Sequence, residues 1–241
     1  MNKYLRLNNY ISKCGICSRR KADSLIKLGF IKVNGKIINT LGYKVLLNND
    51  IIKYNNKIIN IKKKIYLLIN KPKNCITTLK DNKNRNNIMN YIPYIYKKYG
   101  IYPIGRLDKN TTGILLLTND GKLSKKLTHP KYKIKKTYNL ILNKNLKFND
   151  YLKIKKGFFL KEGKIQIEYL NINKKNKKNI TLTIKLGWNK IVHRIFKKIG
   201  YKIVYLDRIN FAGIKKPNIK TGKYIVLSKK KIDFIKKINK L

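Results

Sequence analysis

The chain has 241 residues, 43% of them hydrophobic, so it is long enough for one substantial core plus a small extra domain and is not wholly disordered. Its 59 Lys and Arg against 10 Asp and Glu give a net charge of +49, which predicts a polyanionic partner such as nucleic acid. No apolar run is long enough to span a bilayer and residues 1–6 do not resemble a signal peptide, so we expect a cytoplasmic protein that binds no membrane.

The first 60 residues predict a small domain of two short helices and a hairpin. Apolar side chains have helical spacing in the first helix, at positions 5, 7, 10 and 11. Ser18 is placed to cap a second helix that ends at Gly29. Residues 31–38 contain two short apolar runs around Asn34-Gly35, a pair that strongly favours a hairpin turn.

The three cysteines, Cys14, Cys17 and Cys75, agree with a reducing compartment. Cys14 and Cys17 form a C-x-x-C pair, but there is no second pair, and the only histidines are His129 and His193. A zinc ion would lack its third and fourth ligands, so no metal site is predicted. We expect the pair to lie in a turn between helices.

The second domain is expected to span residues 61–241 and to open with an apolar strand at 65–69 that Pro72 ends. The later strands are predicted at 114–117, 137–142, 181–186 and 203–209, and the helices at 121–127, 191–199 and 232–238. Residues 173–179, rich in Lys and Asn, predict a hairpin loop. Irregular mixing of these elements indicates an α+β fold with a mainly antiparallel sheet.

The loop at residues 103–113 holds one carboxylate, Asp108, between Arg106 and Lys109, and has glycines at both ends. Neighbouring cations favour the ionised carboxylate, which can act as a nucleophile or a general base. Taken alone, however, a turn with a surface ion pair explains such a loop better.

The wider pattern changes that interpretation. Gly105-Arg106-Leu107-Asp108, followed by the run from Asn110 to Gly121, resembles the catalytic motif of the RsuA/RluB/RluF family of ribosomal RNA pseudouridine synthases. The resemblance covers nearly the whole chain. Residues 3 to about 50 look like the family's ribosomal-protein S-four-like RNA-binding domain, and further similar segments lie at 67–72, 136–138 and 196–213.

The resemblance implies that Asp108 attacks the target uridine at the ribose anomeric carbon or at the base. The glycosidic bond then breaks, and the uracil turns and rejoins the ribose through its C5 carbon. Such an isomerisation requires no redox change, metal or cofactor. Tyr138 would stack on the base and assist proton transfer, a role that suits a flat, titratable phenol.

One segment, residues 187–196, departs from the family pattern, because His193 stands where the family usually has the arginine or lysine that pairs with the nucleophile. His193 could pair with Asp108 as a cation, Arg194 or Lys190 could replace it, or the site could be weakened. An adjacent carboxylate is expected to raise the pKa of His193 above about 6.5, and if His193 is the partner of Asp108, activity should decline as the pH rises past this raised pKa.

Two further groups of residues complete the predicted site. The substrate-binding group is Arg106, Ile184 and Asn189. In the N-terminal domain, two adjacent arginines stand out against the lysine-rich background and suit phosphate recognition. The predicted RNA-binding group is Arg6, Ser18, Arg19, Arg20 and Lys21.

Together, these features predict a site-specific enzyme that isomerises uridine to pseudouridine in ribosomal RNA, with 23S RNA favoured over 16S RNA. Its substrate would be the RNA or an assembling ribosomal subunit, and the enzyme would act as a monomer. The alternative is a catalytically weakened RNA-binding factor of the same family that serves ribosome assembly. A basic structural protein of the ribosome agrees less well with the ordered motif around Asp108.

Overall fold

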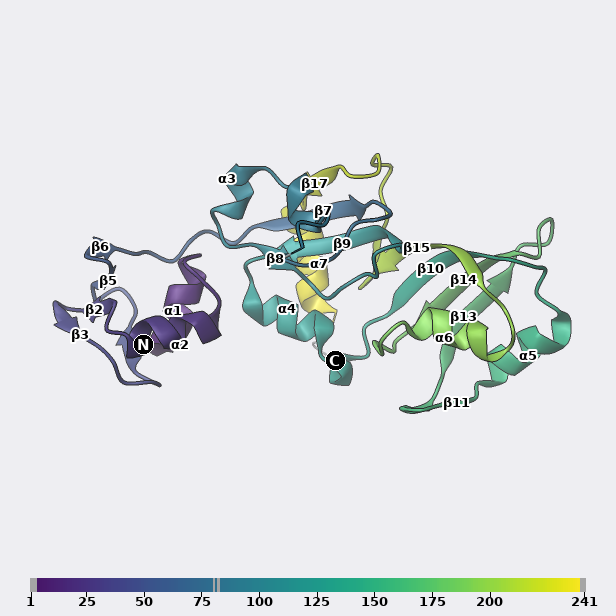
Figure 1. The fold of residues 1–241 in the computed structure, drawn as a ribbon, viewed down its shortest axis with the longest axis horizontal. Coiled ribbons are helices and arrows are strands. Elements are labelled where there is room, and N and C mark those ends of the chain that lie inside the picture. The colour runs from purple at the N-terminus through teal and green to yellow at the C-terminus, as the bar shows by residue number, and fades with distance from the viewer. Residues whose placement is uncertain (1–3, 80, 82, 239–241) are drawn as a thin grey trace. The chain divides into compact units, whose positions relative to one another are not determined.

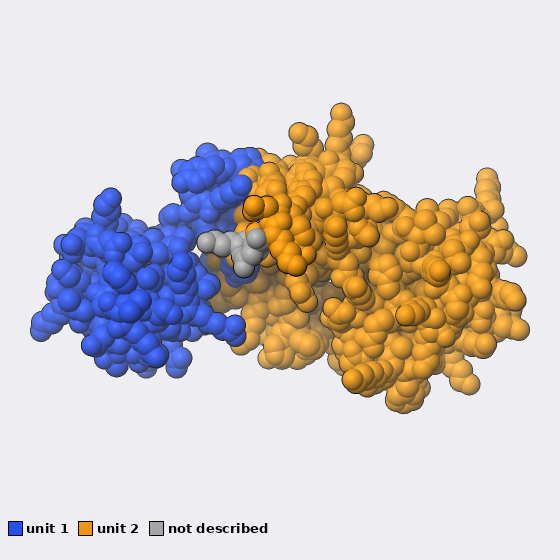
Figure 2. Space-filling model, in the orientation of Figure 1, with its two compact units in different colours: residues 1–65, 93–102 blue, residues 66–92, 103–241 orange. Residues whose placement is uncertain are grey.

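The structure is a computed structural model that describes residues 4–79, 81 and 83–238. The chain forms two compact units, one of residues 1–65 with 93–102 and the other of residues 66–92 with 103–241 (Figure 2). Within the described residues, no helix is long and apolar enough to cross a membrane. Each unit has its own hydrophobic core.

The first unit packs two short helices, α1 (Leu7–Lys13) and α2 (Arg19–Lys27), beside small antiparallel sheets. One sheet has the order β3-β2-β5-β6, and the other pairs β1 with β4. The strands are β1 (Tyr4–Arg6), β2 (Ile31–Val33), β3 (Lys36–Ile37), β4 (Lys44–Leu46), β5 (Ile52–Tyr54) and β6 (Lys57–Ile58). The short helix α3 (Tyr94–Lys97) also belongs to this unit.

Local sequence explains these elements. The Ser18 side chain accepts a hydrogen bond from the Lys21 backbone N–H and so caps α2, as predicted. Asn34 and Gly35 both have positive φ, of 50° and 84°, as the tight turn between β2 and β3 requires. The predicted helices and hairpin are therefore confirmed, and Cys14 and Cys17 lie in the connection between α1 and α2.

The second unit is built on a mixed sheet with the order β13-β14-β10-β15-β9-β7-β17 (Figure 1). Neighbouring strands are antiparallel except β15 and β9, which run parallel. The strands on this path are β7 (Tyr66–Lys71), β9 (Thr112–Thr118), β10 (Lys136–Leu142), β13 (Ile167–Ile172), β14 (Asn179–Ile184), β15 (Ile203–Phe211) and β17 (Tyr224–Val226). The predicted α+β class with a mainly antiparallel sheet is confirmed.

Helices pack beside this sheet (Figure 1). The main core joins side chains of β7, β9 and the end of β15 to apolar residues of α4 (Gly121–Thr128) and α7 (Lys229–Lys237). The remaining elements are α5 (Phe148–Lys156), α6 (Ile191–Lys198), the 3-10 turns η1 (Ile88–Tyr91) and η2 (Pro130–Tyr132), and short strands β8 (Tyr102–Pro103), β11 (Phe159–Leu160), β12 (Gly163–Lys164) and β16 (Ile214–Lys215).

Every strand and helix that the sequence predicted in this unit is present, with its ends shifted by a few residues. The predicted loop at 173–179 connects β13 to β14. The sequence did not reveal β13, β17 or α5. The apolar pattern is weak in β13 because many of its positions face solvent, and in α5 because it contains many lysines. The secondary structure of both segments therefore depends on tertiary packing.

Candidate active site

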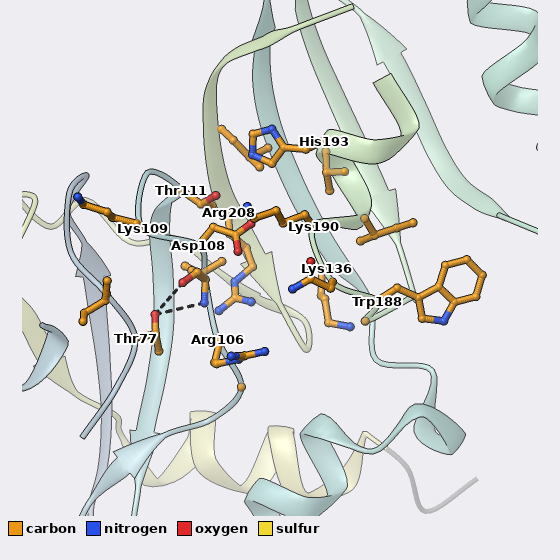
Figure 3. A pocket seen from close by; sticks show the side chains of 18 of the residues that line it. Thr77, Arg106, Asp108, Lys109, Thr111, Lys136, Trp188, Lys190, His193 and Arg208 are labelled. Carbon is orange, nitrogen blue, oxygen red and sulfur yellow. Dashed lines mark hydrogen bonds between the residues drawn. The ribbon is translucent and has the colours of Figure 1, made fainter. Parts of the chain in front are cut away.

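A cavity of about 790 Å³ opens at the end of the central strands of the second unit. Its lining includes residues from the segments around Thr77, Asp108, Leu127, Tyr138, Trp188 and Arg208. Figure 3 labels four of these, Thr77, Asp108, Trp188 and Arg208. The pocket therefore gathers residues from six separate parts of the sequence, among them the carboxylate of Asp108. Its volume suits a ligand the size of a nucleotide.

The loop that carries Asp108 is fastened to its surroundings on both sides. The hydroxyl of Thr77 donates to the carbonyl of Leu107 at 2.9 Å and accepts from the Leu107 N–H at 3.3 Å (Figure 3). On the other side, the ammonium of Lys71 donates to the carbonyls of Lys109 and Thr111, at 3.1 and 2.8 Å. These bonds fix the backbone on either side of Asp108.

Lys71, the last residue of β7, is completely buried, and burial lowers its pKa to about 8. Its three acceptors are backbone carbonyls, the third being that of Pro72 at 3.0 Å. A buried cation costs free energy unless such partners compensate it. The ammonium of Lys71 thus ties the end of β7 to the loop that carries Asp108.

Gly113 allows β9 and β15 to approach closely beside the loop. Its φ is +104°, and a Cβ there would lie 2.4 Å from both the backbone N and O of Arg208. Only glycine fits this position. The close approach puts Arg208 of β15 in register with Gly113 of β9 on one side and with Tyr138 of β10 on the other.

Arg208 supplies a buried positive charge to the cavity. It is 2% exposed, its Nε donates to the Ile114 carbonyl at 2.9 Å, and its guanidinium lies 4.6 Å from the Phe211 ring centroid. Among the residues that the structure describes, none accepts a hydrogen bond from its Nη2. Burial lowers the pKa of this guanidinium and the nearby Tyr138 phenol opposes that effect, but arginine starts high enough to stay protonated.

Tyr138 and Lys136 come from the same strand, β10, and both line the cavity. Tyr138 is 7% exposed. Lys136 donates to the carbonyls of Lys185 and Leu186 at 3.3 and 3.1 Å, and burial lowers its pKa to about 8. The structure therefore brings Asp108 and Tyr138 to one pocket, together with the cations Arg208 and Lys136, which the sequence interpretation missed.

His193, on the first turn of α6, also lines the cavity (Figure 3). Burial lowers its pKa, and this effect outweighs the attraction of Asp108, while Lys190 acts in the same direction as burial. The expectation of a raised pKa was therefore wrong, because it considered the carboxylate and neglected desolvation. Near neutral pH this imidazole is mainly uncharged.

Arg194 is engaged elsewhere. Its guanidinium forms a two-point ion pair with Glu162, with one contact at 2.6 Å, and donates to the Asn189 carbonyl at 3.3 Å. It does not belong to the lining of the cavity. Because its guanidinium is paired with Glu162 and lies outside the cavity lining, Arg194 is not placed to form an ion pair with Asp108.

The predicted substrate-binding residues have different positions. Arg106 and Asn189 are exposed and line the cavity, as does Lys190, whose backbone is left-handed at φ 45°. Ile184 is fully buried in β14 and lies outside the lining. The structure thus separates Ile184 from the pocket that holds the other two.

The predicted RNA-binding residues all belong to the first unit. Four are exposed cations at the ends of β1 and α2, namely Arg6, Arg19, Arg20 and Lys21. Arg19 donates to the side chain of Asn8 at 3.5 Å, and Asn8 donates to Asp23 at 2.8 Å. Ser18 serves as the cap of α2, so the structure gives it a role in local folding.

The cysteines Cys14, Cys17 and Cys75 are all free thiols. Across the part of the chain that the structure describes, no group of three or more His, Cys, Asp or Glu side chains could hold a metal ion.

Comparison with known proteins identifies both units. Residues 65–224 match the family model described as RNA pseudouridylate synthase, and residues 5–52 match that of the S4 domain. A solved structure entitled "Crystal structure of pseudouridylate synthase" superimposes with a TM-score of 0.68 and 26% identity, covering 96% of this chain and 99% of that one.

Two curated relatives span nearly the full length. The ribosomal large subunit pseudouridine synthase B of Bacillus subtilis is 40% identical, over 90% of this chain and 89% of its own. The protein of the same name in Buchnera aphidicola is 32% identical, over 97% and 98%. The chain therefore belongs to the RsuA/RluB family of RNA pseudouridine synthases and carries an N-terminal S4 RNA-binding domain.

Proposed function

We propose that this enzyme converts one uridine of large-subunit ribosomal RNA to pseudouridine, with Asp108 as the nucleophile. The observation that carries the proposal is the cavity, in which Asp108, Tyr138 and the buried cation Arg208 lie together in a member of this family. The names of the relatives from B. subtilis and B. aphidicola favour large-subunit over small-subunit RNA.

In the proposed reaction, Asp108 attacks the uridine at C1′ or at the base, and the C1′–N1 bond breaks. The uracil rotates in the pocket, and a new C5–C1′ bond forms. The bond between Asp108 and the substrate breaks and releases the carboxylate, C5 loses its proton, and N1 gains one. Atoms and electrons balance without any co-reactant. Tyr138 covers the base and is placed to assist the proton transfer, since its phenol borders the same cavity.

The cation that accompanies the nucleophile is, in this proposal, Arg208. His193 is mainly neutral near pH 7, and Arg194 is paired with Glu162, so neither supplies a free positive charge. Arg208 is charged and buried, and its Nη2 amino group has no hydrogen-bond acceptor among the described residues. In a low-dielectric pocket such a group stabilises negative charge on the nucleophile or on the uracil effectively.

We take residues 1–60 as the RNA-binding domain and 61–241 as the catalytic domain. The exposed cations Arg6, Arg19, Arg20 and Lys21 suit contacts with phosphate, which position an RNA without reading its bases. The RNA is presented either free or in an assembling subunit, to an enzyme that acts as a monomer. Three free thiols support a reducing compartment, and the proposal places the enzyme in the cytoplasm.

The test is to incubate unmodified 23S and 16S RNA transcripts separately with the wild-type protein and with Asp108→Ala. Pseudouridine is mapped by carbodiimide adducts and primer extension. We expect one new stop in 23S RNA that the variant does not produce. A stop in 16S RNA alone would overturn the choice of substrate, and no stop with either protein would favour a binding factor without activity.

A further inference from the structure

Trp188 occupies an unusual place in the cavity. It is the only tryptophan in the chain, and it lies between β14 and α6, in the short segment that departs most from the family pattern. The side chain is half-buried and lines the same cavity as Asp108. In Figure 3 it lies at the edge of the labelled group, with Lys136 and Lys190 between it and Asp108.

A hairpin supports the indole from the side. Strand β12 begins with Gly163, which pairs with Leu160 of β11, and a Cβ on this glycine would lie 3.6 Å from Cη2 of Trp188 and 3.9 Å from Cζ2. These are ordinary van der Waals distances, so the benzene edge of the indole lies beside the glycine. The neighbouring Glu162 is bound to Arg194 of α6, which ties the hairpin to the helix that follows Trp188. The indole therefore lies next to a hairpin that is itself bonded to α6.

The surroundings of the indole combine an aromatic surface with positive charge. Lys136, Lys190 and Arg106 line the same cavity, whereas its carboxylates are Asp108 and Asp81, the latter paired with Arg85 at 2.6 Å. An aromatic platform beside several cations is the arrangement by which proteins hold unpaired nucleotides, since bases stack on the ring and phosphates meet the cations.

We infer that Trp188 stacks on an unpaired nucleobase next to the target uridine. This inference rests on the proposed function, because it assumes that RNA enters the cavity. The uridine must leave its helix to reach Asp108, which unstacks its neighbour. The indole replaces the lost stacking partner at the rim of the cavity, while Tyr138 covers the reacting base inside it. Stacking tolerates any base, so Trp188 holds the RNA without selecting its sequence.

The first test uses the fluorescence of the single tryptophan in the full-length protein. We expect an unmodified 23S RNA transcript to quench the emission of Trp188, and inorganic polyphosphate, which has negative charge but no bases, to leave it nearly unchanged. The control is a double variant, Trp188→Phe with Tyr169→Trp, which moves the tryptophan to an exposed position of β13 outside the cavity and corrects for absorbance by the RNA. Equal quenching by RNA and polyphosphate, or no quenching beyond the control, would overturn the inference.

The second test separates stacking from packing. Trp188→Ala should raise the KM for pseudouridine formation in the 23S transcript by roughly 5- to 150-fold, with a smaller effect on kcat, if one base–aromatic stack is lost. Trp188→Phe should restore most of the loss, because it keeps a ring, and Trp188→Leu should not. Equal KM values for the Phe and Leu variants, or an unchanged KM in Trp188→Ala, would contradict stacking.

The two proposals fail in different ways. If the wild-type protein forms no pseudouridine, the proposed function fails, and the fluorescence titration still decides whether position 188 receives a base. If the enzyme is active and the emission of Trp188 responds no more than that of the Tyr169→Trp control, only the inference about Trp188 fails.

Discussion

Replacing Arg208 by Met should separate stability from activity. The substitution removes the Nε bond to the Ile114 carbonyl and the contact with the Phe211 ring, together worth about 2–4 kcal/mol. It also removes a fully buried cation with an unpartnered Nη2, whose desolvation costs several kcal/mol, on the order of the same size. The free energy of unfolding should therefore change by no more than about 2 kcal/mol.

Activity should respond far more strongly. If Arg208 stabilises negative charge during the reaction, its loss should lower the single-turnover rate by roughly 10²- to 10³-fold. Arg208→Lys is the matched control. It keeps the positive charge but lacks the planar guanidinium, which donates to the Ile114 carbonyl through Nε while its other nitrogens face the pocket. The assays are single-turnover pseudouridine formation and guanidinium unfolding. A rate within about threefold of wild type in Arg208→Met would refute the role of this cation.

Three further predictions follow from the surroundings of the site. Gly113→Ala should lower the free energy of unfolding by at least about 3 kcal/mol, measured by guanidinium unfolding, because the new Cβ would collide with the backbone of Arg208; a loss below about 1 kcal/mol would show that the strands separate easily. Lys71 has a pKa of about 8 in the folded protein against an ordinary 10.5, so the unfolded chain binds more protons between these values, and the contribution of Lys71 to the free energy of unfolding should rise by about 3 kcal/mol as the pH increases through that window. Lys136 acts in the same direction, whereas the raised pKa values of the buried Cys14 thiol and Tyr66 phenol act against it, so the measurement is the difference in unfolding free energy between wild type and Lys71→Met, and a difference that does not grow in favour of wild type from pH 8 to 10 would contradict the assignment. Since the pKa of His193 is lowered, His193→Gln should leave the shape of the pH–rate profile above about pH 6.5 unchanged, whereas a decline above pH 7 that His193→Arg removes would restore histidine as the cation.

The sequence was sufficient for the features that local patterns determine. Ser18 before a helix, Asn34-Gly35 between apolar runs and the apolar strand that includes Ile114 each lie where the pattern indicated. The loop of Asp108 could be interpreted only through the resemblance of its surroundings, since a carboxylate between two cations is also an ordinary turn.

The other features of the site depend on contacts between residues far apart in the chain, which local sequence patterns do not reveal. Arg208 lines the cavity because the parallel pairing of β15 with β9 puts it beside residues that come 94 and 95 positions earlier in the chain. The sequence of β15 itself does not indicate that Arg208 is a pocket residue. Lys71 similarly reaches carbonyls 38 and 40 residues away. The direction of the pKa of His193 depended on burial, which no spacing of residues reveals.

Trp188 illustrates the opposite case, in which the sequence contained the signal but the structure was needed to interpret it. In the sequence, its segment stands out by the histidine five residues later, His193. The structure shows that Trp188 lines the cavity, beside Gly163 and close to several cations. From this position we expect the indole to stack on a base of the bound RNA.

The central claim is that Asp108 drives an isomerisation in which the C5 proton of a uridine is replaced by a bond to ribose. The most direct measurement is the release of tritium to water from 23S RNA transcribed with uridine labelled at C5. Wild-type protein should release tritium up to a limit of one equivalent per RNA, and Asp108→Ala and Asp108→Asn should release none while they still bind the transcript. Release by either variant at the wild-type rate, or none by the folded wild-type enzyme bound to its RNA, would contradict the account.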